Sequence, residues 1–156
     1  MIIVGYQGIG KSTAAGKNGV IDLESGNFFI ENENGESVRS DDWYKIYANI
    51  ADHLSKQGYV VMTASHKVFR DYMDEKGIEY ITMSPSVELK DEWIKKLEDR
   101  YNQTNLIKDY KALMNAKDKY VENVTDLQKG NYCIIDDINY NLVDMIEDLK
   151  VTSKYF

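Results

Sequence analysis

Residues 5–13 have the types and spacing of a phosphate-binding loop. They read Gly-Tyr-Gln-Gly-Ile-Gly-Lys-Ser-Thr and match the complete pattern G-x-x-x-x-G-K-[ST]. Glycine lets consecutive backbone N–H groups curl closely around a phosphate chain. The motif therefore predicts that the phosphates of ATP bind to Gly8, Ile9, Gly10, Lys11, Ser12 and Thr13.

Two side chains of this motif have distinct predicted tasks. Lys11 would reach the β- and γ-phosphate oxygens and act in catalysis, and the hydroxyl of Ser12 would ligate Mg²⁺. We therefore expect ATP and Mg²⁺ as the cofactors. The alternative is a glycine-rich turn that binds nothing, so the elements on either side of the motif decide between the two interpretations.

The motif needs a buried strand before it and a helix after it, and the sequence predicts both. A compact run of β-branched residues predicts a strand over residues 2–5, and residues 11–17 can form a short helix. The helix would add its N-terminal partial positive charge beneath the phosphates. The local sequence thus favours phosphate binding.

Strands and helices alternate along the rest of the chain, which is typical of an α/β fold with a mainly parallel sheet. The alternation predicts further strands at residues 19–23, 59–63, 78–83 and 131–135. It predicts helices from 40 or 41 to 57, from 67 to 76, from near 87, and from 141 to 150. We expect a long loop over 25–40, and one or two mobile helices outside the core over 102–129. The expected fold is one α/β domain over 1–156, with a five-stranded sheet and helices on both faces.

Composition limits the classes of partner. The formal net charge of −7 argues against a nucleic acid polymer, because phosphate backbones demand a basic surface, whereas a nucleotide needs only a local positive pocket. Cys133 is the only cysteine, so no intrachain disulfide is possible and a reducing compartment is expected. No apolar stretch has the length of a membrane span, and a chain that starts on its first strand leaves no room for a signal peptide. We expect a cytoplasmic protein without a membrane partner.

Further site residues are expected where parallel strands end, because ligands of open α/β sheets bind beyond the carboxyl ends of the strands. Asp22 could hold an attacking hydroxyl or water, or bind Mg²⁺ through water, and its alternative role is to cap the following loop. His66 could contact a substrate or simply begin a helix. The polar residues that follow the strands are Asp22, Glu24, Ser25, Ser65, His66, Ser84, Ser86, Asp136 and Asp137.

The chain has three arginines, and two of them draw attention by position alone. Arg70 would point toward the mouth of the site if its helix begins near residue 65, and an ordinary surface cation is the alternative. Arg100 lies at the entry to the lysine-rich segment and could swing over the transferring phosphoryl group. A charge pair with Asp99 or Glu98 is its alternative role.

The apolar run that ends in Asp136 and Asp137 is similar to a Walker B strand. Such a strand reaches Mg²⁺ only if it lies beside the strand of the phosphate-binding motif. Spacing along the chain does not reveal strand order, so both possibilities stay open for this pair.

The order of elements resembles that of the nucleoside monophosphate kinases and of the small nucleotide-kinase-like P-loop proteins of bacteriophages. The shared features are the motif G-x-x-G-x-G-K-S-T, a strand that ends in Asp22, a loop-plus-helix insertion and a basic helical segment before the last strand. The resemblance implies a P-loop kinase-type fold in which strand 59–63 lies beside the motif's strand. It also implies that residues 25–57 are an acceptor-binding insertion and residues 100–125 a helical lid.

The resemblance implies ATP-dependent phosphoryl transfer to a small phosphorylated acceptor, most plausibly a nucleoside or deoxynucleoside monophosphate. By position, the acceptor would contact Asp22, Ser25, Arg39, Ser65, His66 and Arg70, and catalysis would use Lys11, Asp22 and Arg100. A phage origin would place the protein in the cytoplasm of its bacterial host. Two alternatives stay open: an NTPase or kinase of a non-nucleotide metabolite, and a non-catalytic nucleotide-binding protein that regulates or contacts the host.

Overall fold

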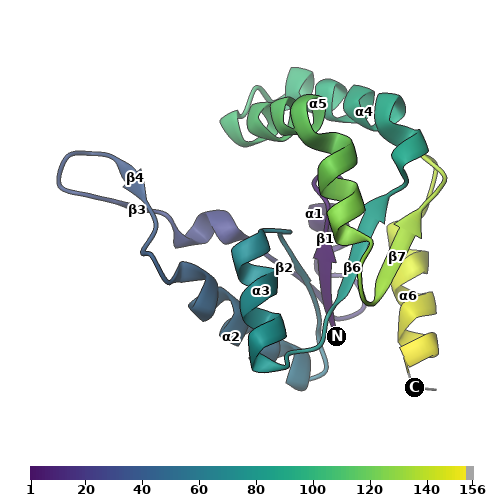
Figure 1. The fold of residues 1–156 in the computed structure, drawn as a ribbon, viewed down its shortest axis with the longest axis horizontal. Coiled ribbons are helices and arrows are strands. Elements are labelled where there is room, and N and C mark those ends of the chain that lie inside the picture. The colour runs from purple at the N-terminus through teal and green to yellow at the C-terminus, as the bar shows by residue number, and fades with distance from the viewer. Residues whose placement is uncertain (154–156) are drawn as a thin grey trace.

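The fold was analysed in a computed structural model that describes residues 1–153 (Figure 1). Within these residues, five strands form a parallel sheet in the order β2-β5-β1-β6-β7. The strands are β1 (Ile2–Gly5), β2 (Val20–Leu23), β5 (Val60–Thr63), β6 (Ile81–Pro85) and β7 (Tyr132–Ile135). Helices flank the sheet, so the predicted α/β class and the predicted five-stranded parallel sheet are confirmed.

Strand β1 lies in the middle of the sheet and delivers the phosphate-binding motif to its centre. Ile3 faces Met62 of β5 on one side and Ile81 of β6 on the other. As expected, the strand near 59–63 is therefore a neighbour of β1. Strand β7 pairs only with β6 at the edge of the sheet, so Asp136 and Asp137 do not follow a neighbour of β1. This order excludes the Walker B role for the two aspartates.

The longer helices cover the sheet and its carboxyl ends (Figure 1). Helices α2 (Trp43–Lys56) and α3 (Lys67–Lys76) pack against each other beside β2 and β5. Helices α4 (Lys90–Thr104) and α5 (Ile107–Leu127) lie together across the carboxyl ends, and α6 (Leu142–Ser153) lies near β7. Among residues 1–153, no helix combines the length and the apolar character needed to cross a membrane.

Helix α1 is shorter than the sequence suggested. It spans Lys11–Ala14, a single turn, whereas a helix over 11–17 was expected. The chain turns at Gly16, which has a φ of 80°, and the Gly16 N–H donates to the Val20 carbonyl at 2.8 Å. This bond draws the chain into β2 and leaves no room for a second turn.

The insertion after β2 is not the structureless loop that we expected over 25–40. A short 3₁₀ helix, η1 (Ser25–Phe28), leads into a hairpin of β3 (Ile30–Glu31) and β4 (Ser37–Val38) that projects from the body (Figure 1). The Asn32 side-chain oxygen accepts the N–H groups of Asn34 and Glu36 and closes the turn. Strands of two residues are too short to show the alternation of apolar side chains by which a sequence reveals a strand.

Two further predictions along the second half of the chain were wrong. Residues 102–129 were expected outside the core, yet α5 buries one stripe at spacings of three and four: Leu113, Ala116, Tyr120, Val124 and Leu127. The lysines of this helix, Lys108, Lys111, Lys117 and Lys119, made the segment read as polar and masked that stripe. The strand expected at 78–83 is shifted to Ile81–Pro85, and η2 (Val87–Leu89) connects it to α4.

Candidate active site

A cleft of about 1430 Å³ opens at the carboxyl ends of the strands. The glycine loop (residues 5–12), the ends of β2 and β5, the insertion, α4 and α5 all contribute to its lining. The residues assigned above to donor binding, acceptor binding or catalysis all line this cleft except Thr13; those that do are Gly8, Ile9, Gly10, Lys11, Ser12, Asp22, Ser25, Arg39, Ser65, His66, Arg70 and Arg100. Four of the shortlisted polar residues are not among its lining residues: Ser84, Ser86, Asp136 and Asp137.

The backbone of the glycine loop explains the glycines of the motif. Gly8 has a φ of 86° and Gly10 a φ of 100°, values that residues with a side chain rarely adopt. A Cβ atom on Gly8 would lie 2.8 Å from Leu97 Cδ2 and 3.3 Å from Trp93 Nε1. The loop thus packs against α4 so closely that a side chain at position 8 would require the Leu97 side chain to shift.

Two aromatic side chains bind the glycine loop from outside the cleft. The indole N–H of Trp93 donates to the Gln7 carbonyl at 2.9 Å, and the hydroxyl of Tyr140 donates to the Ile9 carbonyl at 2.6 Å. In the sequence, Trp93 recurs with Leu89, Leu97 and Tyr101 at intervals of four, a spacing that indicates a packing stripe, and no pattern singles out Tyr140. The only local signal was the aromatic character of the two residues, which by itself does not indicate a bond to a loop far away in sequence.

Lys11 lies inside the cleft with its amine turned toward its own loop. Its Nζ is 3.4 Å from the Gly5 carbonyl oxygen. Burial lowers the pKa of Lys11, whereas the carboxylates of Asp22 and Glu24 raise it. The net shift is downward, and the two carboxylates limit it in favour of the ammonium form, which is the form that binds phosphate oxygens.

Asp22 stands on β2 with one oxygen unsatisfied. Its Oδ1 is buried and has no hydrogen-bond partner among residues 1–153, so this oxygen does not cap the loop that follows. Burial raises the pKa of Asp22 to about 6, with a further contribution from the neighbouring Glu24 carboxyl, and Lys11 opposes the shift. A carboxyl group with a pKa in this range can both accept and release a proton near neutral pH.

His66 connects the ends of β2 and β5. Its Nε2 is 3.3 Å from Ser25 Oγ, and its ring meets that of Trp43 edge to face at 5.1 Å. Burial lowers the pKa of His66 to about 4, and the positive charges of Arg39 and Lys11 add to this effect. At neutral pH His66 is therefore an uncharged hydrogen-bonding group rather than a cation for phosphate.

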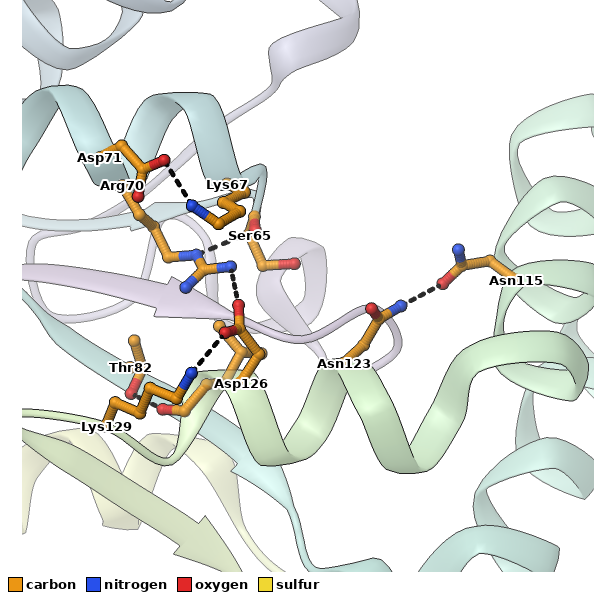
Figure 2. Close-up of polar contacts among 10 residues, drawn as sticks. Ser65, Lys67, Arg70, Asp71, Thr82, Asn115, Asn123, Asp126 and Lys129 are labelled. Atoms are coloured by element: carbon orange, nitrogen blue, oxygen red, sulfur yellow. Dashed lines mark hydrogen bonds and ion pairs between the residues drawn. The ribbon is translucent and has the colours of Figure 1, made fainter.

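Arg70 reaches from α3 to the C-terminal part of α5, as Figure 2 shows. One guanidinium nitrogen, Nη2, is 2.7 Å from Asp126 Oδ2, and Nε donates to the Ser65 carbonyl at 3.2 Å. Lys129 binds the other oxygen of Asp126 at 2.9 Å. With its side chain 13% exposed, Arg70 is not an ordinary surface cation.

Arg100 pairs across the α4–α5 contact and not within its own helix. Its Nε lies 3.0 Å from Asp109 Oδ1, and the Asp109 side chain is 5% exposed. Thr104 donates a hydrogen bond to the other oxygen of Asp109. Of the two partners expected from sequence, Asp99 instead faces Lys95 at 3.4 Å.

Arg39 comes from the insertion and lies between two aromatic rings. Its guanidinium carbon is 4.2 Å from the centre of the Phe29 ring and 4.1 Å from that of Trp43. Such contacts hold a guanidinium by its flat faces and leave its edge free for hydrogen bonds. The insertion thus presents at the cleft a cation that forms no ion pair with any carboxylate of residues 1–153.

The cleft carries charge of the opposite sign to the whole chain. Among residues 1–153, eight Lys or Arg side chains line it against five Asp or Glu, although the formal net charge of the chain is −7. The cations are Lys11, Arg39, Lys67, Arg70, Arg100, Lys108, Lys111 and Lys129, and the carboxylates are Asp22, Glu24, Asp109, Glu122 and Asp126. Low-dielectric walls that carry an excess of positive charge concentrate anionic ligands.

The structure contains no ready-made metal cage, since residues 1–153 hold no group of three or more His, Cys, Asp or Glu side chains placed to bind an ion. Mg²⁺ does not require one. It keeps several waters and is usually held by one or two protein ligands together with phosphate oxygens. The Ser12 hydroxyl lines the cleft and fits that donor set.

No protein-family model matches the chain, and no curated protein does either. The structure is similar to that of a tunicamycin resistance protein from Deinococcus radiodurans, with a TM-score of 0.58 over 97% of this chain and 94% of that one. The two sequences are 12% identical. At that level the likeness shows a shared fold and carries no statement about activity.

Proposed function

We propose that this chain binds a nucleoside triphosphate with Mg²⁺ on its glycine loop and transfers the terminal phosphoryl group to a small phosphorylated acceptor in the same cleft. The leading acceptor is a nucleoside or deoxynucleoside monophosphate. The observation that carries the proposal is the excess of positive charge in a cleft that contains the phosphate-binding motif, within an otherwise acidic protein.

The donor side of the cleft would be formed mostly by backbone. The N–H groups of residues 8–12 would surround the phosphates, Lys11 would neutralise their charge, and Ser12 would hold Mg²⁺, which when bound supplies further charge neutralisation. The helix dipole contributes little here because α1 is a single turn. Binding of the donor therefore depends on the loop itself and on Lys11.

The acceptor side would use the three arginines. Arg39, Arg70 and Arg100 come from the insertion, α3 and α4, yet all three line the cleft. Asp126 and Asp109 pair with two of them, and phosphate oxygens bind a guanidinium through the same N–H donors. An acceptor phosphate could replace those carboxylates, and catalysis would then consist of positioning and charge stabilisation.

A specific observation favours a second candidate, a kinase whose acceptor is a hydroxyl group. Asp22 Oδ1 is buried and unpartnered among residues 1–153, and it lies close enough to Lys11 to affect the pKa of that lysine. A carboxylate there could take the proton of an attacking hydroxyl, whereas it would repel an attacking phosphate. Asp22 is thus the residue that distinguishes the two acceptor classes.

The test is ADP formation from Mg-ATP with a panel of acceptors, with products identified by ³¹P NMR. The panel holds nucleoside monophosphates, hydroxylated metabolites, and tunicamycin because of the name of the structural neighbour. ADP that depends on a monophosphate supports the leading proposal, and a phosphorylated hydroxyl supports the second. ADP without any acceptor indicates an NTPase, and binding without turnover indicates a regulatory protein; either result would reject phosphoryl transfer to an acceptor other than water.

Two variants complete the test. Lys11→Ala should lower turnover at least about 100-fold, because it removes the charge that the transferring phosphoryl group needs. Asp22→Asn should lower turnover about 100-fold or more with a hydroxyl acceptor, where a base is lost, and much less with a monophosphate. If Lys11→Ala keeps full activity, the ADP is formed by a contaminating enzyme and not in this cleft.

A further inference from the structure

The glycine loop precedes a helix too short to hold it. At the end of the loop, the N–H groups of Thr13 and Ala14 donate to the Gly10 carbonyl, at 3.1 and 3.0 Å. Four helical residues also provide a weak dipole. The conformation of the loop must therefore be fixed by contacts from elsewhere in the chain.

Trp93 and Tyr140 supply such contacts at alternate peptides. They donate to the carbonyls of Gln7 and Ile9, two residues apart, at 2.9 and 2.6 Å. In a trans peptide the carbonyl of one residue and the N–H of the next point in opposite directions. Each bond therefore turns one N–H group, that of Gly8 or that of Gly10, away from the aromatic rings.

The two donors form one rigid unit. The rings of Trp93 and Tyr140 stack with their centres 5.9 Å apart and an angle of 15° between their planes. Lys96 Nζ donates to the Tyr140 hydroxyl at 2.8 Å and lies 4.3 Å from the centre of the Trp93 ring and 4.7 Å from that of Tyr140. The bond from Lys96 polarises the hydroxyl and strengthens its donation to Ile9.

We propose that Trp93 and Tyr140 are positioning residues for phosphate binding, which hold the Gly8 and Gly10 amides toward the cleft by binding the carbonyls on the other side of the loop. Gly8 and Gly10 line the cleft, and neither aromatic residue is among its lining residues. This role rests on the proposed function, because the ligand that the Gly8 and Gly10 amides would bind is the phosphate chain of the nucleotide. The two aromatic residues replace the support that a longer first helix would give.

The experiment compares Tyr140→Phe and Trp93→Phe with a matched control, Tyr120→Phe. Tyr120 is buried and donates its hydroxyl to the Ser86 carbonyl at 2.8 Å, so the control loses the same kind of bond outside the loop. Each test variant should weaken ATP binding about threefold to tenfold, the equivalent of one hydrogen bond. Amide hydrogen exchange in residues 7–12 should also become faster, whereas the control should change neither measurement.

Wild-type affinity and wild-type exchange in residues 7–12 of both test variants would overturn the proposal, even if their stability fell. An equal change in the control would also overturn it, because the effect would then be general loosening. If the wild-type protein binds no nucleotide, the proposed function fails. Hydrogen exchange still decides the role of the two rings in that case, since it reports on the loop without a ligand.

Discussion

The glycine loop and the three arginines present positive groups to the same cleft in different ways. The loop offers backbone amides, and neutral ring donors hold it by its carbonyls. Arg70 and Arg100 offer guanidinium groups that carboxylates of α5 already occupy. The loop therefore holds its amides in place before an anion binds, whereas an anion that binds Arg70 or Arg100 has to displace a carboxylate.

This difference follows from the energetics of the contacts. The loop carbonyls are bonded by neutral donors on buried or half-buried rings, and breaking such bonds leaves polar groups unpaired. The Arg70–Asp126 pair lies near solvent, with the Asp126 side chain 30% exposed, so its net contribution to stability is modest. A phosphate dianion can replace that carboxylate at little cost. We therefore expect loop variants to affect the fold and donor binding, and arginine variants to affect the acceptor.

The largest effect is expected from Gly8→Ala. The new Cβ would meet Leu97 at 2.8 Å, and alanine would have to adopt a φ of 86°. Strain and overpacking together should lower the free energy of unfolding by about 2–5 kcal/mol. ATP affinity should fall more than about tenfold because the Gly8 amide moves. Chemical denaturation and calorimetric titration measure the two effects.

Gly58→Ala is the matched control for this substitution. Gly58 has a φ of 94° with open space where a Cβ would lie, so it isolates the backbone strain at about 1–2 kcal/mol. ATP affinity should not change in this variant. If Gly8→Ala is no more destabilising than Gly58→Ala, the loop does not pack on α4 as closely as described above.

An intermediate effect is expected from opposite changes to one ion pair. Arg70→Lys keeps the charge but loses the planar fork, so the KM for the acceptor should rise about tenfold while the KM for ATP stays constant. Asp126→Asn weakens the competing pair and should lower the KM for the acceptor. Steady-state kinetics with each substrate varied in turn measures both constants.

Lys67→Met controls for loss of positive charge in the same cleft. Lys67 is exposed and pairs with Asp71 at 2.6 Å, as Figure 2 shows, so its loss should change the KM for the acceptor less than Arg70→Lys does. Equal increases of that KM in Arg70→Lys and Asp126→Asn would show that the ion pair is structural. The contrast between the loop and the arginines would then disappear.

How well a feature could be predicted from the sequence depends on how far apart along the chain the interacting residues lie. The motif and the strand before it are contiguous, and polar residues after strands must gather at one edge of a parallel sheet, which is why Lys11, Asp22 and His66 lie in one cleft. The partners of the arginines are contacts across the fold. Nothing near Arg70 in sequence indicates Asp126, 56 residues further along the chain.

The same limit explains the errors. The length of α1 depends on a bond between Gly16 and Val20 that competes with the helix, and no pattern within residues 11–17 reveals that bond. The buried stripe of α5 was masked because lysines share the helix with it. The ring donors of the loop act over 86 residues for Trp93 and 131 for Tyr140, beyond the reach of any local pattern.

The smallest effect concerns Asp22 and depends on pH. Because its pKa is raised from 3.8 to about 6, the folded protein binds more protons than the unfolded chain between these values, and its stability falls as the pH rises through that window. Asp22→Asn removes the buried charge. At pH 7 the variant should be more stable than wild type by about 1–2 kcal/mol, less than full burial would give because the carboxyl is partly exposed.

The gain should shrink as the pH falls and vanish near pH 3, where Asp22 is largely protonated in the folded and the unfolded protein. Urea denaturation at pH 7 and at pH 3 measures it. His66, with a pKa lowered to about 4, titrates in both proteins and cancels in the difference. Asp136→Asn, an exposed carboxylate outside the cleft, should change stability by less than about 0.5 kcal/mol. A variant that is less stable than wild type at pH 7 would mean that the carboxylate supports the fold. A gain would mean that the chain keeps a destabilising charge beside Lys11, as expected of a group retained for binding or catalysis.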